Sequence, residues 1–181
     1  MATWNSRGLR GSMLEESINM TNEKYRDMGL ALVQKIPTPI TPVEFDKKTN
    51  HIVLAYFEQK STVDYIGAVQ GIPVCFDAKE CATDTFPLQN VHEHQMKFMK
   101  DFEKQGGISF IIIYFKKSDI YMYLPFDKLL SFWERGKNGG RKSFLLSELE
   151  DKYRINVKSG FFVQYLEALN IDILRREDNK E

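Results

Sequence analysis

The 181-residue sequence lacks the marks of a membrane, secreted or nucleotide-hydrolysing protein. It contains no apolar run of about 18 residues, the length that a membrane-spanning helix needs, so no membrane contact is expected. Residues 1–20 have no positively charged stretch followed by an apolar core, which argues against a signal peptide. No glycine-rich loop precedes a Lys-Ser or Lys-Thr pair, so ATP use is not expected. These absences favour a cytoplasmic protein.

Cysteine is also scarce, since Cys75 and Cys81 are the only two in the chain. The segment between them begins as a strand, and extended chain at roughly 3.3 Å per residue would hold them about 20 Å apart. That separation is far beyond disulfide reach. Neither residue has a partner at zinc-site spacing. We expect two reduced thiols.

Net charge gives no general sign of nucleic-acid binding, because 25 basic residues balance 25 acidic ones. The charges are uneven, however, and between residues 128 and 142 five cations accompany one acid. A balanced total therefore leaves room for a basic face. A solvated surface run explains the same pattern at least as well. The five cations are Lys128, Arg135, Lys137, Arg141 and Lys142.

With 43% apolar residues, the chain can form one compact domain over residues 1–181. Ser12 and Glu15 form a capping-box pattern, and the apolar side chains that follow recur at helical spacing, which predicts a helix over residues 13–32. Residues 35–43 hold three prolines and should be extended. A strand returns over residues 52–57. Together they predict a projecting β-hairpin stalk, inserted at about residues 35–60.

The rest of the chain alternates strands and helices. The Gln70-Gly71 pair predicts a tight turn between two strands, and the continuous apolar run over residues 108–115 is typical of a strand buried on both faces. The order of elements implies an α/β fold, a mixed sheet flanked by helices. The predicted strands are 62–69, 72–79, 108–115 and 120–124, and the predicted helices are 88–105, 126–134, 147–152 and 161–169.

The most informative residues lie on the strand predicted over residues 72–79. Alternation turns Phe76 and Ala78 toward the core and places Asp77 and Lys79 together on the other face, about 7 Å apart. Asp64 lies on the preceding strand, across the hairpin turn. If this hairpin pairs, two carboxylates and one ammonium converge on one face.

Such a trio suits the hydrolysis of a phosphodiester. Two carboxylates hold Mg²⁺ through oxygen atoms, and the ion polarises the phosphate and acidifies bound water. A nearby lysine steadies the charge that builds on the phosphate. Taken alone, the Asp77-Ala78-Lys79 string is weak evidence, because a solvated ion pair on a surface strand has the same pattern.

Two further residues have two interpretations each. Gln95 falls among apolar side chains of a predicted helix, where an unpaired amide would be costly. It is either a satisfied structural glutamine or a residue that reaches the metal site through its side-chain oxygen or a water. Glu15 is either the third residue of the capping box or a carboxylate lent to the site, and capping is the simpler interpretation.

Several strings, in this order, resemble the RecU family of Holliday junction resolvases, within the restriction-endonuclease-like PD-(D/E)xK superfamily. The resemblance covers roughly residues 4–155. Many strings in register are far more specific than any one of them. The strings are Arg7-Gly8, Leu14-Glu15, Lys35-Ile-Pro-Thr-Pro39, Ala55-Tyr-Phe57, Ser61-Thr-Val-Asp-Tyr65, Phe76-Asp-Ala-Lys-Glu80, Phe86-Pro-Leu-Gln-Asn90, His94-Gln95, Phe132-Trp133 and Gly140-Arg-Lys-Ser143.

The resemblance implies a restriction-endonuclease-like fold and a role for each site residue. Thr62, Asp64, Asp77 and Gln95 would form a site for Mg²⁺, with Mn²⁺ as a substitute, and Lys79 would stabilise the transition state. The first acid of the strand motif is usually Glu in this family, whereas here it is Asp77. This shorter acid bears on metal preference or rate rather than on function. Relatives often have a longer basic amino terminus as well.

The resemblance also implies a homodimer that cuts symmetric strands of four-way junction DNA and leaves 5′-phosphate and 3′-hydroxyl ends. Its stalk would enter the open junction centre, where Tyr56 and Phe57 can stack on unpaired bases. Ordinary strand aromatics explain these two residues equally well. Such enzymes serve recombination, DNA repair and chromosome segregation, and family analogy alone suggests a recombinase or branch-migration protein as a further partner. The expected phosphate contacts are Arg7, Arg10, Lys60, Arg141 and Lys142.

Overall fold

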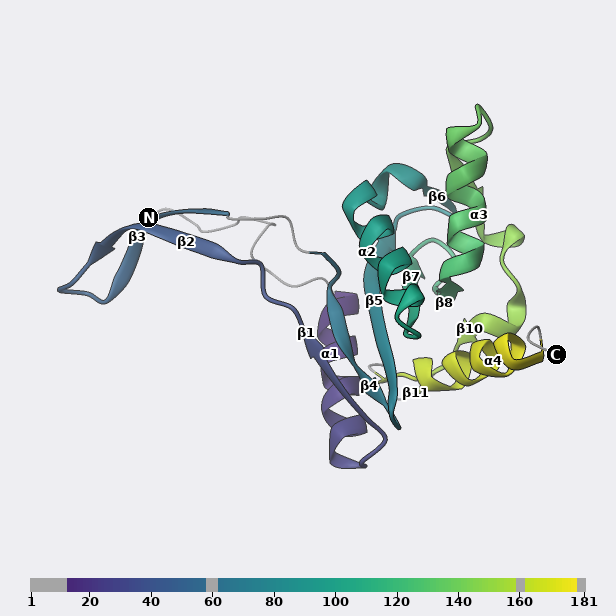
Figure 1. Ribbon diagram of the computed structural model, residues 1–181, viewed down its shortest axis with the longest axis horizontal. Coiled ribbons are helices and arrows are strands. Elements are labelled where there is room, and N and C mark those ends of the chain that lie inside the picture. Colours follow the sequence, from purple (N-terminus) through teal and green to yellow (C-terminus); the bar gives the residue numbers. More distant parts are fainter. Residues whose placement is uncertain (1–12, 58–61, 159–161, 179–181) are drawn as a thin grey trace.

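The computed structural model describes residues 13–57, 62–158 and 162–178 (Figure 1). No helix in these ranges is long and apolar enough to cross a membrane. The helices are α1 (Met13–Asp27), α2 (Glu93–Lys104), α3 (Phe126–Lys137) and α4 (Tyr165–Asp178), with 3-10 turns η1 (Leu88–Asn90), η2 (Leu146–Glu148) and η3 (Asp151–Tyr153). The strands are β1 (Ala31–Lys35), β2 (Ile40–Asp46), β3 (His51–Phe57), β4 (Tyr65–Val69), β5 (Ile72–Cys81), β6 (Thr85–Pro87), β7 (Ile108–Phe115), β8 (Ile120–Pro125), β9 (Ser143–Leu145), β10 (Arg154–Ile155), β11 (Val157–Lys158) and β12 (Phe162–Val163).

Six strands form the central sheet in the order β1-β4-β5-β7-β8-β10. β5 and β7 pair in parallel, and the other neighbours in this sheet are antiparallel. α1 and α4 pack against one face, while α2 and α3 cover the other (Figure 1). The predicted α/β class, with a mixed sheet flanked by helices, is confirmed. Strands between two helical layers are buried on both faces, which explains the apolar run of β7.

A row of stacked aromatic rings crosses one face of this sheet. Tyr65 on β4 stacks on Phe76 of β5 with ring centroids 4.7 Å apart, and Phe76 stacks on Phe110 of β7 at 4.6 Å. Phe110 stacks in turn on Tyr123 of β8 at 4.4 Å. All four rings are buried, and Tyr165 of α4 packs against Phe76. Because stacked pairs stabilise beyond the area they bury, this ring ladder helps to fix the register of neighbouring strands.

α1 ends earlier than the predicted helix over residues 13–32. It stops at Asp27, and Gly29 has a φ of +67°. The amide of Leu30 donates to the carbonyl of Tyr25 at 2.9 Å, a Schellman-type ending that glycine permits. The chain then enters the sheet as β1, where the Leu32 side chain is 65% exposed. The helical spacing that placed Leu32 at the end of the predicted helix was therefore coincidental.

The helix predicted over residues 88–105 is interrupted. η1 takes up its first residues and α2 starts only at Glu93, because the backbone of His92 is extended. The helix predicted near residues 147–152 is the pair of 3-10 turns η2 and η3, and the one near 161–169 begins as β12 before α4. The pattern of apolar residues in such short segments does not distinguish an α-helix from a 3-10 turn or a strand.

β2 and β3 form a two-stranded hairpin that projects away from the sheet (Figure 1). The predicted stalk is present. It begins later in the sequence than residue 35, because Lys35 is the last residue of β1 and the first hairpin strand starts at Ile40. At its tip, the Asp46 carboxylate accepts hydrogen bonds from the Lys48 amide at 2.9 Å and the Thr49 hydroxyl at 2.7 Å. Seven large apolar side chains of the hairpin are 44–61% exposed: Ile40, Val43, Phe45, Ile52, Val53, Leu54 and Tyr56.

Candidate active site

Asp64 and Asp77 meet where β4 and β5 pair. The backbone amide of Asp64 donates to Oδ1 of Asp77 at 2.9 Å, and the amide of Ala78 donates to Oδ2 of Asp64 at 2.9 Å. The two carboxylates therefore converge, as the hairpin argument predicts. β5 is buried on both faces here, so the side that carries Asp77 is covered as well as the core side, and Asp77 is fully buried.

The ring ladder explains why these two acids are neighbours. β4 and β5 are antiparallel, and Tyr65 lies directly opposite Phe76. The residue before Tyr65 therefore lies beside the residue after Phe76, which places Asp64 beside Asp77. The turn at Gln70-Gly71, with φ values of +48° and +88°, joins the two strands without disturbing this register.

Two more side chains bind the Asp77 carboxylate. The Nζ of Lys79 lies 2.8 Å from Oδ2 of Asp77, on the predicted shared face. Gln95 of α2 donates from Nε2 to the same oxygen, and its Oε1 accepts from the His92 amide at 2.9 Å. Gln95 thus caps α2 and orients Asp77 at once. We call Asp64, Asp77, Lys79 and Gln95 the Asp-Lys cluster.

Burial, and then the neighbouring charge of Asp77, raise the pKa of Asp64 to about 6. Two carboxylates this close repel each other unless a proton or a cation lies between them. Their oxygens are hard donors of the kind that a divalent cation such as Mg²⁺ prefers, so the pair fits such an ion. Thr62, two residues before Asp64, is exposed and offers a hydroxyl oxygen. The amide oxygen of Gln95 faces away, so it would bind a cation only after the amide turns over.

Glu15 lies near this pair, in the first turn of α1. Its carboxylate forms an ion pair with Nζ of Lys35 at 2.8 Å, and its backbone carbonyl accepts a hydrogen bond from the Tyr65 hydroxyl at 3.2 Å. The Glu15 charge contributes to the raised pKa of Asp64. The capping-box alternative involves Ser12, which lies outside the described residues.

The predicted DNA contacts that the structure describes fall in two places. Tyr56 is 57% exposed on the stalk. Arg141 and Lys142 are exposed in the loop after α3, where Nε of Arg141 donates to the Ser143 hydroxyl at 3.0 Å. Outside the described part of the chain lie Arg7, Arg10, Lys60 and the side chain of Phe57.

Two contacts that the sequence did not predict hold the cluster in place. The Glu80 carboxylate accepts a hydrogen bond from the Leu14 amide at 3.1 Å and forms an ion pair with Lys116, so it fixes the start of α1 against β5. The Ile36 amide donates to the backbone carbonyl of Asp64 at 2.8 Å, which ties the base of the stalk to the site. The only sequence signal for the first contact is an acid directly after the strand motif.

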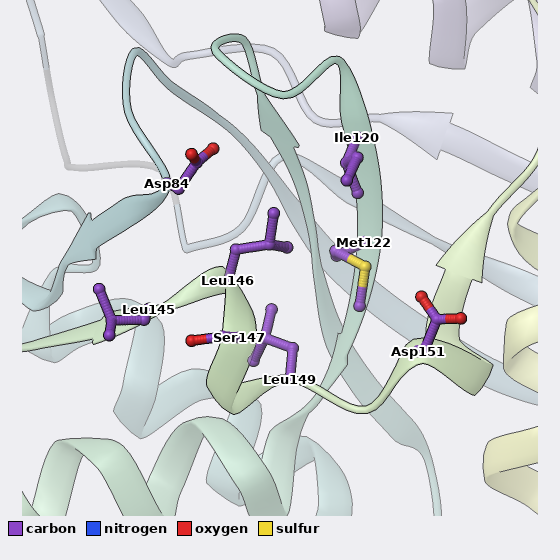
Figure 2. A pocket seen from close by; sticks show the side chains of 8 residues that line it. All are labelled: Asp84, Ile120, Met122, Leu145, Leu146, Ser147, Leu149 and Asp151. Atoms are coloured by element: carbon purple, nitrogen blue, oxygen red, sulfur yellow. The ribbon is translucent and has the colours of Figure 1, made fainter.

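A separate cavity of about 480 Å³ lies near β8, β9 and the 3-10 turns (Figure 2). Most of its lining side chains are apolar, and the carboxylates of Asp84 and Asp151 lie on opposite sides. Asp84 already accepts a hydrogen bond from the Ser118 hydroxyl at 2.6 Å and pairs with Lys117 at 3.3 Å. No member of the Asp-Lys cluster lines this cavity, so it is not the candidate active site.

An α/β sheet that carries an Asp-x-Lys strand motif, with a second acid on the adjoining strand, has the pattern of the PD-(D/E)xK nucleases. The sequence profile described as recombination protein U (RecU) matches residues 9–171. The chain belongs to the RecU family.

Two sequence relatives agree with this assignment. The chain is similar to the Holliday junction resolvase RecU of Pediococcus pentosaceus, at 43% identity over 90% of this chain and 84% of that protein. It is also similar to the protein of the same name from Bacillus pumilus, at 47% identity over 77% of this chain and 69% of that protein. Among solved structures, Hjc of Archaeoglobus fulgidus, a Holliday junction resolvase, matches 65% of this chain and 78% of that chain, with a TM-score of 0.40 and 7% identity.

Proposed function

We propose that this protein is a structure-specific endonuclease that resolves four-way DNA junctions with a divalent metal ion. The pairing of Asp64 with Asp77 beside Lys79 is the observation that carries the proposal. Binding DNA alone gives no reason to gather carboxylates where phosphates must approach, because like charges repel. Membership of the RecU family, whose relatives are named Holliday junction resolvases, supports the choice of substrate.

Asp64 and Asp77 would hold the metal ion, with Thr62 and Gln95 as further oxygen donors. Mg²⁺ is the expected ion and Mn²⁺ a substitute, since both accept carboxylate and water oxygens. A bound ion supplies a Lewis acid that polarises the phosphate and acidifies water. The raised pKa of Asp64 supports this assignment, because a cation relieves the repulsion that burial and Asp77 create.

Lys79 would act on the phosphate directly. The ammonium of Lys79 lies 2.8 Å from the Asp77 carboxylate, which holds it in place. The lysine side chain is still 20% exposed, so a phosphate can reach it. The ammonium has three donors, so it can keep Asp77 and also donate to a phosphate oxygen. That hydrogen bond strengthens as negative charge develops during attack by water. Water attacks the phosphorus and the bond from phosphorus to the 3′ oxygen breaks, which leaves a 5′-phosphate and a 3′-hydroxyl.

The stalk supports both a junction substrate and a homodimer. A two-stranded hairpin is only marginally stable by itself, and its exposed apolar side chains mark a surface that something else covers. A twofold dimer would supply two equivalent Asp-Lys clusters, which is what paired symmetric nicks require. The stalk would enter the open junction centre, with Tyr56 against an unpaired base. Recombination, DNA repair and chromosome segregation would use this activity.

The test is to incubate the protein with a mobile four-way junction, and separately with a linear duplex of matched sequence, in Mg²⁺ or in a chelator. We expect paired symmetric nicks in the junction alone, and only with Mg²⁺. Equal cutting of the duplex would instead identify a general nuclease. Binding of the junction without cutting would identify a non-catalytic junction-binding protein, and either result contradicts the proposal.

A further inference from the structure

We propose that the cavity beside Trp133 is a second DNA contact, which takes one unpaired nucleotide with its base against the indole and its phosphate at Lys142. This inference rests on the proposed function, because it takes DNA as the ligand. It concerns a site separate from the Asp-Lys cluster and from the stalk.

The cavity has the size and the lining of a single-nucleotide site. Its volume of about 340 Å³ lies near the lower end of the range of small-molecule sites, about 300–1,000 Å³. It combines an aromatic ring, an apolar wall, a side-chain amide and two ammonium groups. Stacking on aromatic rings and cations beside the backbone are the usual means of binding single strands. The lining residues are Leu88, Gln89, Trp133, Gly136, Lys137 and Lys142.

Gly136 lets α3 pack closely against η1 beside the cavity. A Cβ atom at this position would lie 3.1 Å from Cδ1 of Leu88, which is tighter than ordinary contact. A larger side chain would therefore displace Leu88 and change the shape of the cavity. Leu88 is also fixed from the other side, since its amide donates to the carbonyl of Lys142 at 3.1 Å.

The two lysines of the cavity are held differently. Nζ of Lys137 lies 3.0 Å from the Glu93 carboxylate and 5.7 Å from the centre of the Trp133 ring. Exposed ion pairs and exposed cation–π contacts are weak, so a base can replace Lys137 over the ring. Lys142 is exposed and forms no ion pair with another described residue. Its ammonium is therefore the group best placed to take a phosphate without a competing contact.

A short stretch of chain joins the cavity to the Asp-Lys cluster. η1, which forms one wall, is followed by Val91 and His92, and α2 then begins. The His92 amide donates to Gln95, and Gln95 donates to Asp77. A strand with a phosphate at the cluster would bring nearby nucleotides to this cavity. The indole needs a base with a free face, and bases are unstacked most easily where strands exchange partners.

Fluorescence of Trp133 tests this directly, because the chain has only two tryptophans. In a Trp4→Phe variant, Trp133 is the single reporter. Titration in a chelator with a four-way junction, or with a short oligothymidylate, should quench its fluorescence, whereas a matched linear duplex should quench it much less. Unchanged fluorescence while the junction binds would overturn the inference.

Affinity gives a second, independent readout. Trp133→Ala should weaken junction binding roughly 5- to 100-fold, and Trp133→Phe, which keeps a ring, should bind nearly as well as the wild type. Lys142→Ala should lower the slope of log affinity against log salt by about one. The matched control is Lys104→Ala, at the far end of α2, where the lysine pairs with Asp101 and does not line the cavity. It should change neither affinity nor slope.

The outcomes separate this inference from the proposed function. If Trp133→Ala and Lys142→Ala behave like Lys104→Ala while the wild type cleaves junctions, the cavity inference is wrong and the proposed function stands. If the wild type neither binds nor cleaves junctions, both are wrong. Thermal unfolding of each variant shows whether it folds, and the Trp4→Phe titration decides the matter even if Trp133→Ala does not.

Discussion

The backbone amide of Asp64 donates a hydrogen bond of 2.9 Å to the carboxylate of Asp77. The backbone directly before β4 therefore holds the Asp77 carboxylate beside Asp64. Under the proposed function, such a site would be organised for a cation before the cation arrives. The cost of that arrangement is visible in the raised pKa of Asp64.

Asp64→Asn should abolish cleavage and stabilise the metal-free protein at about pH 8. Folding raises the pKa of Asp64 from 3.8 to about 6, so the folded state binds this proton more tightly than the unfolded chain does. The wild type therefore loses stability as pH rises through that window, and a neutral amide avoids a loss of about 1–3 kcal/mol. Urea unfolding in a chelator measures the difference. The gain should be close to zero near pH 4, and a gain of equal size at both pH values would contradict the account.

Glu15→Gln should slow junction cleavage roughly tenfold, on the order of 1.4 kcal/mol, because the lost carboxylate lies close enough to act on Asp64. Lys35→Ala is the matched control, since it breaks the same ion pair but keeps the acid. Both variants should lose less than about 1 kcal/mol of stability, as exposed pairs do. Equal cleavage rates for Glu15→Gln and Lys35→Ala would contradict a role of Glu15 in cleavage and would leave it only a role at the start of α1.

Replacing Tyr65 or Phe76 by leucine should slow cleavage more than the loss of stability explains. The stacked pair sets the register that brings the acids together, and such pairs couple by about 0.5–1.5 kcal/mol. The control pair is Phe86 and Phe144, which stack at 5.0 Å between β6 and β9. Double-mutant cycles, with stability measured by urea unfolding, give the coupling energy of each pair. Cleavage is then assayed under conditions in which all variants are folded, and the two pairs are compared. Parallel losses of cleavage in both pairs would contradict the role of the ladder.

Replacing residues 45–53 by a two-residue Asn-Gly turn, which joins the paired residues Glu44 and Leu54, should reduce the preference for junctions over duplex. The shortened hairpin keeps a favourable turn but cannot reach the junction centre. Competition binding with junction and matched duplex measures the ratio. Cleavage chemistry at the distant Asp-Lys cluster should survive, so a preference equal to that of the wild type would show that the stalk does not select the substrate.

Three members of the cluster, Asp64, Asp77 and Lys79, were predictable because their arrangement depends on short-range geometry. Alternation along β5 sets Asp77 and Lys79 on one face, and a two-residue turn brings Asp64 alongside. The buried run of β7 was equally clear, because helices on both sides of a sheet demand apolar residues at every position.

Contacts between distant segments were not predictable. The hydrogen bond from Leu14 to Glu80 joins residues 66 positions apart, and no local pattern marks it. Nor does the sequence indicate that the Gln95 amide turns its nitrogen to Asp77 and its oxygen to His92. The early end of α1 did have a signal, Gly29, which the apolar repeat concealed.

Lys79→Ala, assayed for junction binding and junction cleavage in the same Mg²⁺ buffer, tests the central claim most directly. The account predicts that cleavage falls by at least about 10²- to 10³-fold, because the variant lacks the ammonium that stabilises the developing charge. Affinity should change only a few fold, since many other phosphate contacts remain. Lys104→Ala, which removes the exposed lysine paired with Asp101 at the end of α2, is the control and should cleave normally. Cleavage by Lys79→Ala at nearly the wild-type rate, or a loss of binding large enough to explain its loss of cleavage, would contradict the account.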